Sequence, residues 1–177
     1  SAVFAEWGYE RNPELPLRIP SHEYCDEEHT RRGAWRGAFC GLGIIHGFEN
    51  SWGPFAKLEE DQPGIAHLLQ VRRFFTQVAP FHALRPAPEL VADGDSYAPG
   101  ERPLTLASED RGTIAAYLPV GGTVRVSTPE AVTRYRASWF NPCTGGTRGA
   151  TATGGRFSAP QRLRNGHPRD WVLVLNR

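Results

Sequence analysis

The chain opens on residues 1–10, SAVFAEWGYE, a short apolar run followed by two carboxylates and by two aromatic side chains around a glycine. The run Val3-Phe4-Ala5 is typical of a strand in a parallel sheet, whose residues are buried on both faces. Glu6 follows directly, so we expect the strand to end there and to carry this carboxylate at its tip. The elements predicted around this strand decide whether Glu6 has a structural or a chemical role.

Strand and helix patterns alternate through the first half of the chain. Asp26 is a favourable N-cap, and Glu27 and Glu28 are acidic residues of the kind that stabilise the first turn of a helix. Residues 44–47 predict a second short strand, followed by a loop and a second helix. The apolar residues at helical spacing are Ala34, Trp35, Ala38, Phe39 and Leu42 in the first helix, and Ile65, Leu68, Leu69, Val71, Phe74, Phe75 and Val78 in the second. This order of elements is typical of a parallel sheet with crossover helices.

The second half contains no helical pattern. Short β-type runs recur between turn signals such as Gly121-Gly122, which is typical of a small antiparallel sandwich. The runs are residues 104–106, 113–118, 123–127, 135–140, 156–158 and 171–175. The prolines of RPAPEL (85–90) favour an extended linker, so we place a domain boundary near residue 80. We expect residues 80–177 to fold on their own.

Two parallel strands with two helices do not make a complete α/β domain, because a parallel sheet needs covered faces and paired edges. We therefore interpret residues 1–79 as a partial β/α (TIM-type) barrel segment and residues 80–177 as a small antiparallel β-sandwich. The predicted fold class is α+β. On this interpretation the chain begins in the middle of a larger fold.

Composition argues against several function classes. The chain has 177 residues, of which 40% are hydrophobic, and a net charge of +1 without charged blocks, so we expect no nucleic acid and no membrane as a partner. It contains no apolar run near the ~20 residues of a membrane span. Cys25, Cys40 and Cys143 lack the paired spacing of a zinc site, so we expect no metal and no cofactor, while one disulfide among them stays open.

Polar side chains follow both predicted strands, where a β/α barrel carries its functional groups. Carboxylates with aromatic neighbours suit a sugar site, because a carboxylate stabilises an oxocarbenium-like centre while a flat ring packs on the sugar. The candidates are Glu6, Tyr9 and Glu10 after the first strand, and His46, Glu49, Asn50 and Trp52 after the second. The structural alternatives are that Glu6 pairs with Arg31 or Arg32, that His46 is a loop or core histidine, and that Trp52 is a core residue.

Several motifs, in order along the chain, resemble one family. EWGYE (6–10), HTRRGAW (29–35), GLGIIHGFENSW (41–52), PGIAHLLQVRRFF (63–75) and RPAPELV (85–91) are similar to the closing segment of the apiosidase-like glycoside hydrolase barrels. AAYLPVGGTVRV (115–126), ASWFNPCTGG (137–146) and DWVLVL (170–175) resemble the β-domain that follows this barrel, whose family label is "putative collagen-binding domain". The resemblance spans essentially the whole chain.

The resemblance implies that Glu6 is the nucleophile of a retaining glycoside hydrolase. Its implied substrate contacts are Tyr9, Glu10, Arg31, Arg32, His46, Asn50 and Trp52. His46 stands where the family usually has tyrosine, and Cys143 where an arginine usually follows the Asn-Pro or Asp-Pro pair. A retaining site needs a second carboxyl group about 5–5.5 Å from the nucleophile. The family carries that group on an earlier barrel strand, so we expect this chain alone to be inactive.

Three functions stay open at this point. The first is a C-terminal fragment of a carbohydrate-active glycoside hydrolase, with a missing N-terminal barrel portion as its partner. The second is a non-catalytic module that binds carbohydrate or a matrix protein through exposed aromatic residues, with Tyr97, Tyr117, Tyr135 and Trp139 as candidates, although a core position is expected for Trp139 and Trp171. The third is a scaffold that only packs against its own barrel. The resemblance implies a plant or microbial polysaccharide or oligosaccharide as the ligand, and an extracellular or periplasmic location in a bacterium.

Overall fold

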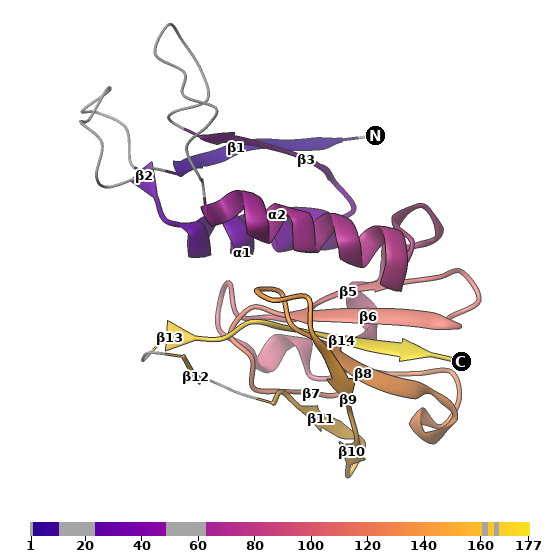
Figure 1. Ribbon diagram of the computed structural model, residues 1–177. Helices are drawn as coiled ribbons and strands as arrows, with labels where there is room; N and C mark the ends of the chain where they lie inside the picture. Colours follow the sequence, from indigo (N-terminus) through magenta and orange to yellow (C-terminus); the bar gives the residue numbers. More distant parts are fainter. Residues whose placement is uncertain (1, 11–23, 49–62, 161–162, 165–166) are drawn as a thin grey trace, which may run out of the picture.

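The fold is mixed α/β and is built in layers. The computed structural model describes residues 2–10, 24–48, 63–160, 163–164 and 167–177. The side chains of Glu6, Tyr24, Leu163, Arg164, His167 and Pro168 lie outside this description. A parallel sheet lies on one side of a pair of α-helices, and a six-stranded antiparallel sheet lies on the other (Figure 1). A smaller antiparallel sheet packs on the far face of the six-stranded sheet. Within the described residues there are two α-helices, and most strand pairs are antiparallel.

The parallel sheet and the helix pair come from the first part of the chain. The sheet has the order β2-β1-β3, with β1 (Val3–Glu10), β2 (Tyr24–Cys25) and β3 (Gly43–Phe48). The helices are α1 (Glu27–Phe39) and α2 (Pro63–Arg73), and the π-helical segment η2 (Phe74–Val78) continues α2. The predicted order of strand, helix, strand and helix is confirmed, with the short β2 as an addition.

β1 is longer than the sequence predicts. It continues past Glu6, because Tyr9 and Glu10 pair with β2 and with the end of β3. The register between β1 and β3 shifts between Ala5 and Tyr9, as at a β-bulge. The expectation that the strand ends at Glu6 is therefore wrong: Glu6 lies at an irregularity inside β1, and the strand ends at Glu10.

α1 begins as predicted and lets β1 approach closely. Asp26 is its N-cap and accepts a hydrogen bond from the backbone N–H of His29 at 2.8 Å. A Cβ atom on Gly33 would lie 2.0 Å from Nε1 of Trp7, so the missing side chain makes room for this ring. Gly37, one turn later, makes room for Phe4 in the same way. The parallel sheet thus packs directly on α1.

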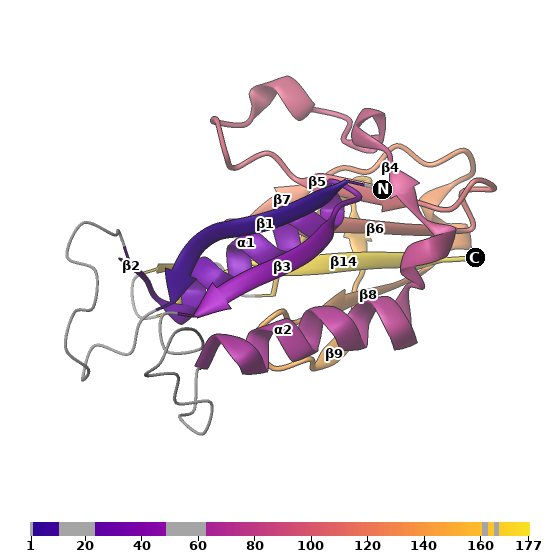
Figure 2. The same cartoon turned by 90° about the horizontal axis from the view of Figure 1, so that it is seen from above.

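α2 lies beside α1, away from the cover of the parallel sheet. In Figure 2, β1 and β3 cross over α1, while α2 lies to the side of β3. Ile65 and Leu69 are 44% and 53% exposed, so the expectation that both belong to the buried stripe is wrong. Val71 and Phe74 of that stripe are buried as predicted. The difference arises because no strand in the described part of the chain lies over this side of α2.

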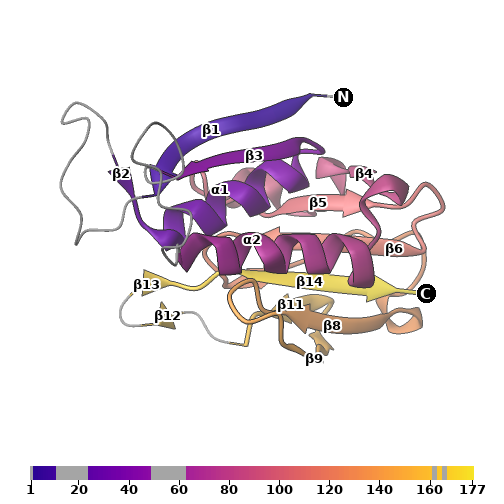
Figure 3. The same cartoon turned by 45° about the horizontal axis from the view of Figure 1, so that its top comes forward.

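The six-stranded sheet has the order β4-β5-β6-β14-β8-β9. Its strands are β4 (Arg85–Pro86), β5 (Leu104–Ala107), β6 (Thr113–Leu118), β14 (Trp171–Asn176), β8 (Arg136–Phe140) and β9 (Thr147–Gly149). The central β14 alternates between two cores, because successive strand residues point to opposite faces. Val172 and Val174 face the helices, whereas Leu173 and Leu175 face the smaller sheet. Figure 3 shows both helices side by side over this sheet.

The smaller sheet completes an arrangement that resembles a β-sandwich. It has the order β10-β11-β7, with β7 (Thr123–Val124), β10 (Ala152–Thr153) and β11 (Arg156–Ser158). The remaining elements are the antiparallel strand pair β12 (Leu163–Arg164) and β13 (His167–Pro168) and the 3₁₀ segments η3 (Phe81–Ala83), η4 (Pro88–Leu90), η5 (Gly94–Ser96) and η6 (Val132–Arg134). Ala87 and Leu90 of the expected linker are buried in the core between the two sheets, so this segment is packed rather than free.

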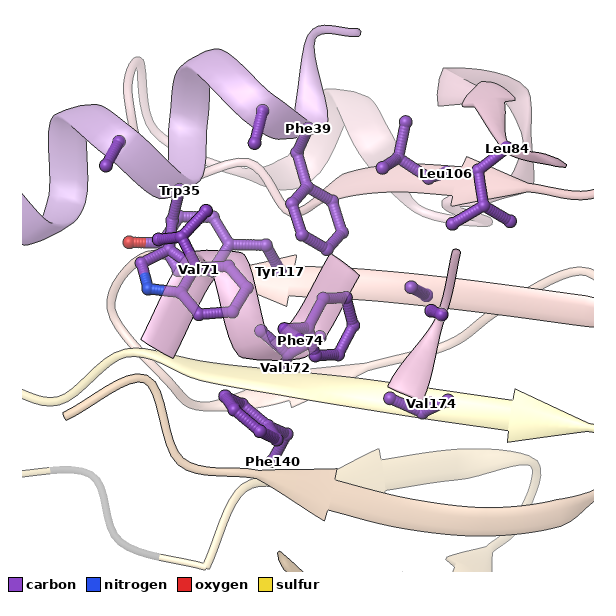
Figure 4. Close-up of a cluster of buried hydrophobic side chains, with 14 residues drawn as sticks. Trp35, Phe39, Val71, Phe74, Leu84, Leu106, Tyr117, Phe140, Val172 and Val174 are labelled. Carbon is purple, nitrogen blue, oxygen red and sulfur yellow. The ribbon is translucent and has the colours of Figure 1, made fainter. Parts of the chain in front are cut away.

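One hydrophobic core joins the helices to the six-stranded sheet. Figure 4 shows Trp35 and Phe39 of α1 and Phe74 of η2 pointing toward Tyr117 and Phe140 of the sheet. The ring of Trp35 lies 6.0 Å from that of Tyr117 and 5.8 Å from that of Phe140. Residues 80–177 alone would expose this face of the sheet, and the expectation that they fold on their own stays a prediction. The boundary near residue 80 stays a prediction.

Candidate functional site at the strand ends

Glu10, at the end of β1, is tied to both helices. Only 2% of its surface is exposed. Thr30 Oγ1 donates a hydrogen bond to Glu10 Oε2 at 2.7 Å, and the backbone N–H of Gly64 donates one to Oε1 at 2.8 Å. Thr30 lies in the first part of α1 and Gly64 at the start of α2. The carboxylate thus accepts from the N-terminal region of two helices, where the helix dipole favours negative charge.

His46 of β3 extends this arrangement on the side that faces the helices. Its Nε2 atom lies 3.1 Å from Thr30 Oγ1. Because Thr30 gives its only hydroxyl proton to Glu10, the geometry fits a neutral His46 that donates through Nε2–H. The ring centroid lies 4.5 Å from that of Trp7 and 4.9 Å from that of Phe48. We call Glu10, Thr30 and His46 the strand-end cluster.

Burial perturbs both titratable members of the strand-end cluster. Burial raises the pKa of Glu10 above its usual value, while the hydrogen bonds from Thr30 and Gly64 oppose this rise by stabilising the carboxylate. Burial also lowers the pKa of His46 to about 4, and the charge of His29 acts in the same direction. His46 is therefore uncharged at neutral pH. Perturbed pKa values of this kind occur at functional sites and in purely structural networks.

Arg31 faces away from the strand-end cluster and binds the six-stranded sheet. Its Nε donates to Oδ1 and Oδ2 of Asp170 at 3.1 and 3.2 Å, and its Nη2 lies 3.1 Å from Oδ1. Tyr117 OH donates to the same carboxylate at 3.1 Å. Burial alone would lower the pKa of Arg31, but the charge and hydrogen bonds of Asp170 raise it, so the guanidinium stays charged. We call Arg31, Asp170 and Tyr117 the interlayer network.

The other predicted site residues lie in several places. Tyr9 pairs with Gly47 of β3, and a Cβ atom on Gly47 would lie 2.6 Å from the ring of Tyr9. Gly47 is on the same face of β3 as the exposed Ile45. Arg32 is half-buried, with Nη2 3.6 Å from Oε2 of Glu28. The structure brings Glu10 and His46 together and directs Arg31 elsewhere. The side chain of Glu6, together with Glu49, Asn50 and Trp52, lies outside the described residues, and their roles stay predictions.

Most aromatic candidates for ligand binding in the second half are core residues. Tyr117 and Tyr135 are buried, which corrects the suggestion that they form an exposed binding surface. Their hydroxyl groups are used internally, since Tyr117 OH donates to Asp170 and Tyr135 OH to the carbonyl of Arg111. Trp139 is buried as expected, in contact with Trp171. Tyr97 is half-buried and donates to the carbonyl of Thr123.

Three residues that organise this region were not singled out by the sequence. Thr30 follows the N-cap Asp26 by one helical turn, and its position in the first turns of a helix beside a predicted strand was the available signal. Asp170 is a carboxylate directly before the apolar run of β14, a position where a buried charge requires a partner. Gly64 carries no comparable signal, because its role is to offer a backbone N–H in a space that a side chain would fill.

Within the described residues there is no group of three or more His, Cys, Asp or Glu side chains placed to hold a metal ion. A helix long and apolar enough to cross a membrane is likewise absent from the described part of the chain. The three cysteines have free thiols, and burial raises the pKa of Cys143.

A family model described as "Putative collagen-binding domain of a collagenase" matches residues 86–176. Among curated proteins, none matches the chain.

Solved structures resemble the chain over both of its parts. A protein described as "Glycoside hydrolase" matches with a TM-score of 0.63 and 17% identity, over 95% of this chain and 40% of its own. A glycoside hydrolase family 5 protein from Bacteroides vulgatus matches with a TM-score of 0.62 and 18% identity, over 95% of this chain and 39% of its own. A protein from the same organism, described as a "putative glycoside hydrolase", matches with a TM-score of 0.51 and 13% identity. The match covers 96% of this chain and 35% of that protein. The chain thus spans about two fifths of the length of the first two proteins.

Proposed function

The chain belongs to the family described as "Putative collagen-binding domain of a collagenase", and we propose that here this domain closes the C-terminal part of a carbohydrate-active glycoside hydrolase. In this proposal residues 1–79 supply the last two strands of a β/α barrel, and Glu6 is the strand-end nucleophile. The substrate is a plant or microbial polysaccharide or oligosaccharide, degraded outside the cytoplasm of a bacterium. The rest of the barrel is supplied by residues N-terminal to Ser1.

The observation that carries this proposal is the exposed apolar surface on one face of the parallel sheet. Val3 and Ile45 are 54% and 57% exposed on the face that points away from the helices. Parallel sheets are normally covered on both faces, so this apolar surface is typical of a sheet that continues into a larger structure. Similarity to glycoside hydrolases over 95% of the chain supports the same arrangement.

A pocket beside β3 also supports the proposal that the parallel sheet continues beyond this strand. It has a volume of about 410 Å³ and lies between β3, α1 and α2. Its lining is mainly apolar and includes Leu42, Ile44, Leu68 and Phe75. β3 is also an edge strand in the described sheet, with its free edge available to a further strand. A further β/α unit paired with β3 would fill this pocket and cover the side of α2 that carries Ile65 and Leu69.

Two experiments test the proposal. The coding sequence upstream of Ser1 is expected to encode further β/α units and a strand-end carboxylate that serves as the acid/base. An open reading frame that begins at this point, with no such units, would overturn it. The 177-residue chain is expected to show no turnover of aryl glycosides, because retaining hydrolysis needs both carboxyl groups. Turnover that disappears in Glu6→Gln would contradict the assignment of the acid/base to the missing part.

A second candidate function is ligand binding by the part that the family model matches, residues 86–176, which we call the β-domain; the description of the family favours this function. Its aromatic candidates are now reduced to Tyr97, because Tyr117, Tyr135 and Trp139 are buried. Titration of the chain with soluble collagen and with polysaccharides, followed by calorimetry, separates the two functions. Saturable binding that is lost in Tyr97→Ala would favour the binding module. No binding to either ligand is the expected result.

A further inference from the structure

Two consecutive residues of α1 bind the two opposite layers of the molecule. Thr30 donates to Glu10 of the parallel sheet, and Arg31 donates to Asp170, the residue directly before β14 of the six-stranded sheet. Both Thr30 and Arg31 are buried. The same turn of helix is therefore fixed from both sides, and a displacement on one side is transmitted to the other.

The attachment on the β-domain side is the stiffer of the two. Asp170 and Tyr117 are fully buried, and the planar guanidinium of Arg31 donates to both oxygens of Asp170. A guanidinium–carboxylate pair of this kind restricts orientation as well as distance. Tyr117 OH, a third donor, fixes the rotation of the Asp170 carboxylate. Loss of Asp170 would leave the charge of Arg31 buried without its main partner, which strongly favours displacement of the helix turn.

The second partner of Glu10 also depends on the β-domain. Gly64 is the second residue of α2. This helix and its continuation η2 are anchored by Val71 and Phe74 in the core shared with the six-stranded sheet. Both hydrogen bonds to the Glu10 carboxylate therefore come from helices whose positions are set by the β-domain. The parallel sheet contributes the carboxylate, while the β-domain determines where its donors lie.

We propose that Asp170 of the β-domain is a positioning residue for the strand-end cluster, acting through Arg31 and Thr30. The β-domain then fixes the positions of the residues at the strand ends, rather than being an independent module attached to them. This coupling is a property of the described chain. Only the assignment of the strand ends to a glycosidase site rests on the proposed function, so the coupling can be tested without activity.

The test is the titration of the His46 ring, followed by NMR of the histidine side chains in the full chain. The wild-type ring is expected to titrate at about 4, because burial and His29 hold its pKa down. In Asp170→Asn, loosening of the first turn of α1 hydrates the ring, and the His46 pKa is expected to rise by about one unit. Removal of a negative charge at Asp170 would by itself favour the neutral ring and lower the pKa, so the sign of the shift separates positioning from a direct charge effect.

Two further variants keep the test decisive. Tyr117→Phe removes one hydrogen bond from Asp170 and is expected to give a smaller rise; it decides the question if Asp170→Asn does not fold. Leu173→Ala is the control, because Leu173 lies in the core on the opposite face of the six-stranded sheet from Tyr117.

A rise in Asp170→Asn or Tyr117→Phe, with none in Leu173→Ala, supports the proposal. An unchanged or lowered His46 pKa in a folded Asp170→Asn protein overturns it, as does an equal rise in Leu173→Ala, which would point to general loosening. If only Tyr117→Phe folds, an unchanged pKa in that variant overturns the proposal as well.

Discussion

The two sheets that flank the helices both contain strands with apolar runs, but the faces of these sheets differ in how far they are buried. β14 and its neighbour β6 carry continuous apolar runs, and both of their faces are buried. The strands β1 and β3 also carry apolar runs, but only the face that meets α1 is covered, while Val3 and Ile45 on the other face are exposed. The same pattern therefore describes a completed sheet in one place and a sheet with an open face in the other. A strand that is apolar on both faces therefore indicates that both faces of its sheet need to be packed against other elements, whether or not the described chain supplies those elements.

The largest expected effect is a difference in stability when an isoleucine is replaced by alanine in each of the two sheets. Ile114 of β6 is 1% exposed and Ile45 of β3 is 57% exposed. Ile114→Ala is expected to lower the free energy of unfolding by ~2–5 kcal/mol, because it leaves a cavity in a closed core. Ile45→Ala is expected to change it by less than about 0.5 kcal/mol, as is usual for surface positions. Urea denaturation measures both, and a similar loss in the two variants would show that the open face is covered in solution.

A smaller effect is expected at the contact between the strand end and α2. A Cβ atom on Gly64 would lie 1.7 Å from Oε2 of Glu10, so Gly64→Ala must displace the helix or the carboxylate. We expect a loss of ~1–3 kcal/mol in the free energy of unfolding, which is typical of overpacking. Gly149→Ala in the edge strand β9 is the matched control, because its Cβ atom would meet nothing within 4 Å. Equal thermal midpoints for the two variants would contradict the close packing of α2 on Glu10.

The smallest net effect is a pH dependence that arises at the strand-end cluster, where His46 and Glu10 act in opposite directions. The unfolded His46 protonates near pH 6.5, whereas the folded protein resists protonation until about pH 4. The unfolded state therefore binds more protons in this window, and His46 makes stability fall as the pH falls from about 6.5 to about 4. Glu10, whose pKa is raised by burial, acts in the opposite direction, because its folded form binds protons more readily than its unfolded form.

The contribution of His46 is isolated by comparing variants. Free energies of unfolding measured across this pH range should fall less steeply in His46→Gln than in the wild type. His82→Gln, at an exposed position, serves as the control and should keep the wild-type slope. Identical slopes in all three proteins would show that His46 is not buried as described.

The sequence predicted the elements better than their connections. The strands near residues 104, 113, 136, 156 and 171 and the N-cap at Asp26 were confirmed, because alternation and capping are local properties. The end of β1 was misplaced, because pairing with β2 and β3 extends the strand beyond its apolar run. The short edge strand β9 was missed, since its exposed residues carry no alternating pattern.

The candidate site was predicted in part. Glu10 and His46 were found because they follow apolar runs, and they do lie in one cluster. The partner of Arg31 was not predictable, because Asp170 lies 139 residues away along the chain and meets it only through the packing of α1 on the six-stranded sheet. Contacts of this range depend on the tertiary arrangement, and no local pattern in the sequence reports them.

The most direct test of the shared helix layer is native-state hydrogen exchange of the full chain. If α1 and the six-stranded sheet form one unit, amides of Trp35–Phe39 in α1 and of Val172–Val174 in β14 should exchange with the same free energy, that of global unfolding. Amides of β1 and β3 should open with a lower free energy, because one face of their sheet is exposed. Protection of β14 well above that of α1 would contradict this account, since the β-domain would then persist after the helices had opened.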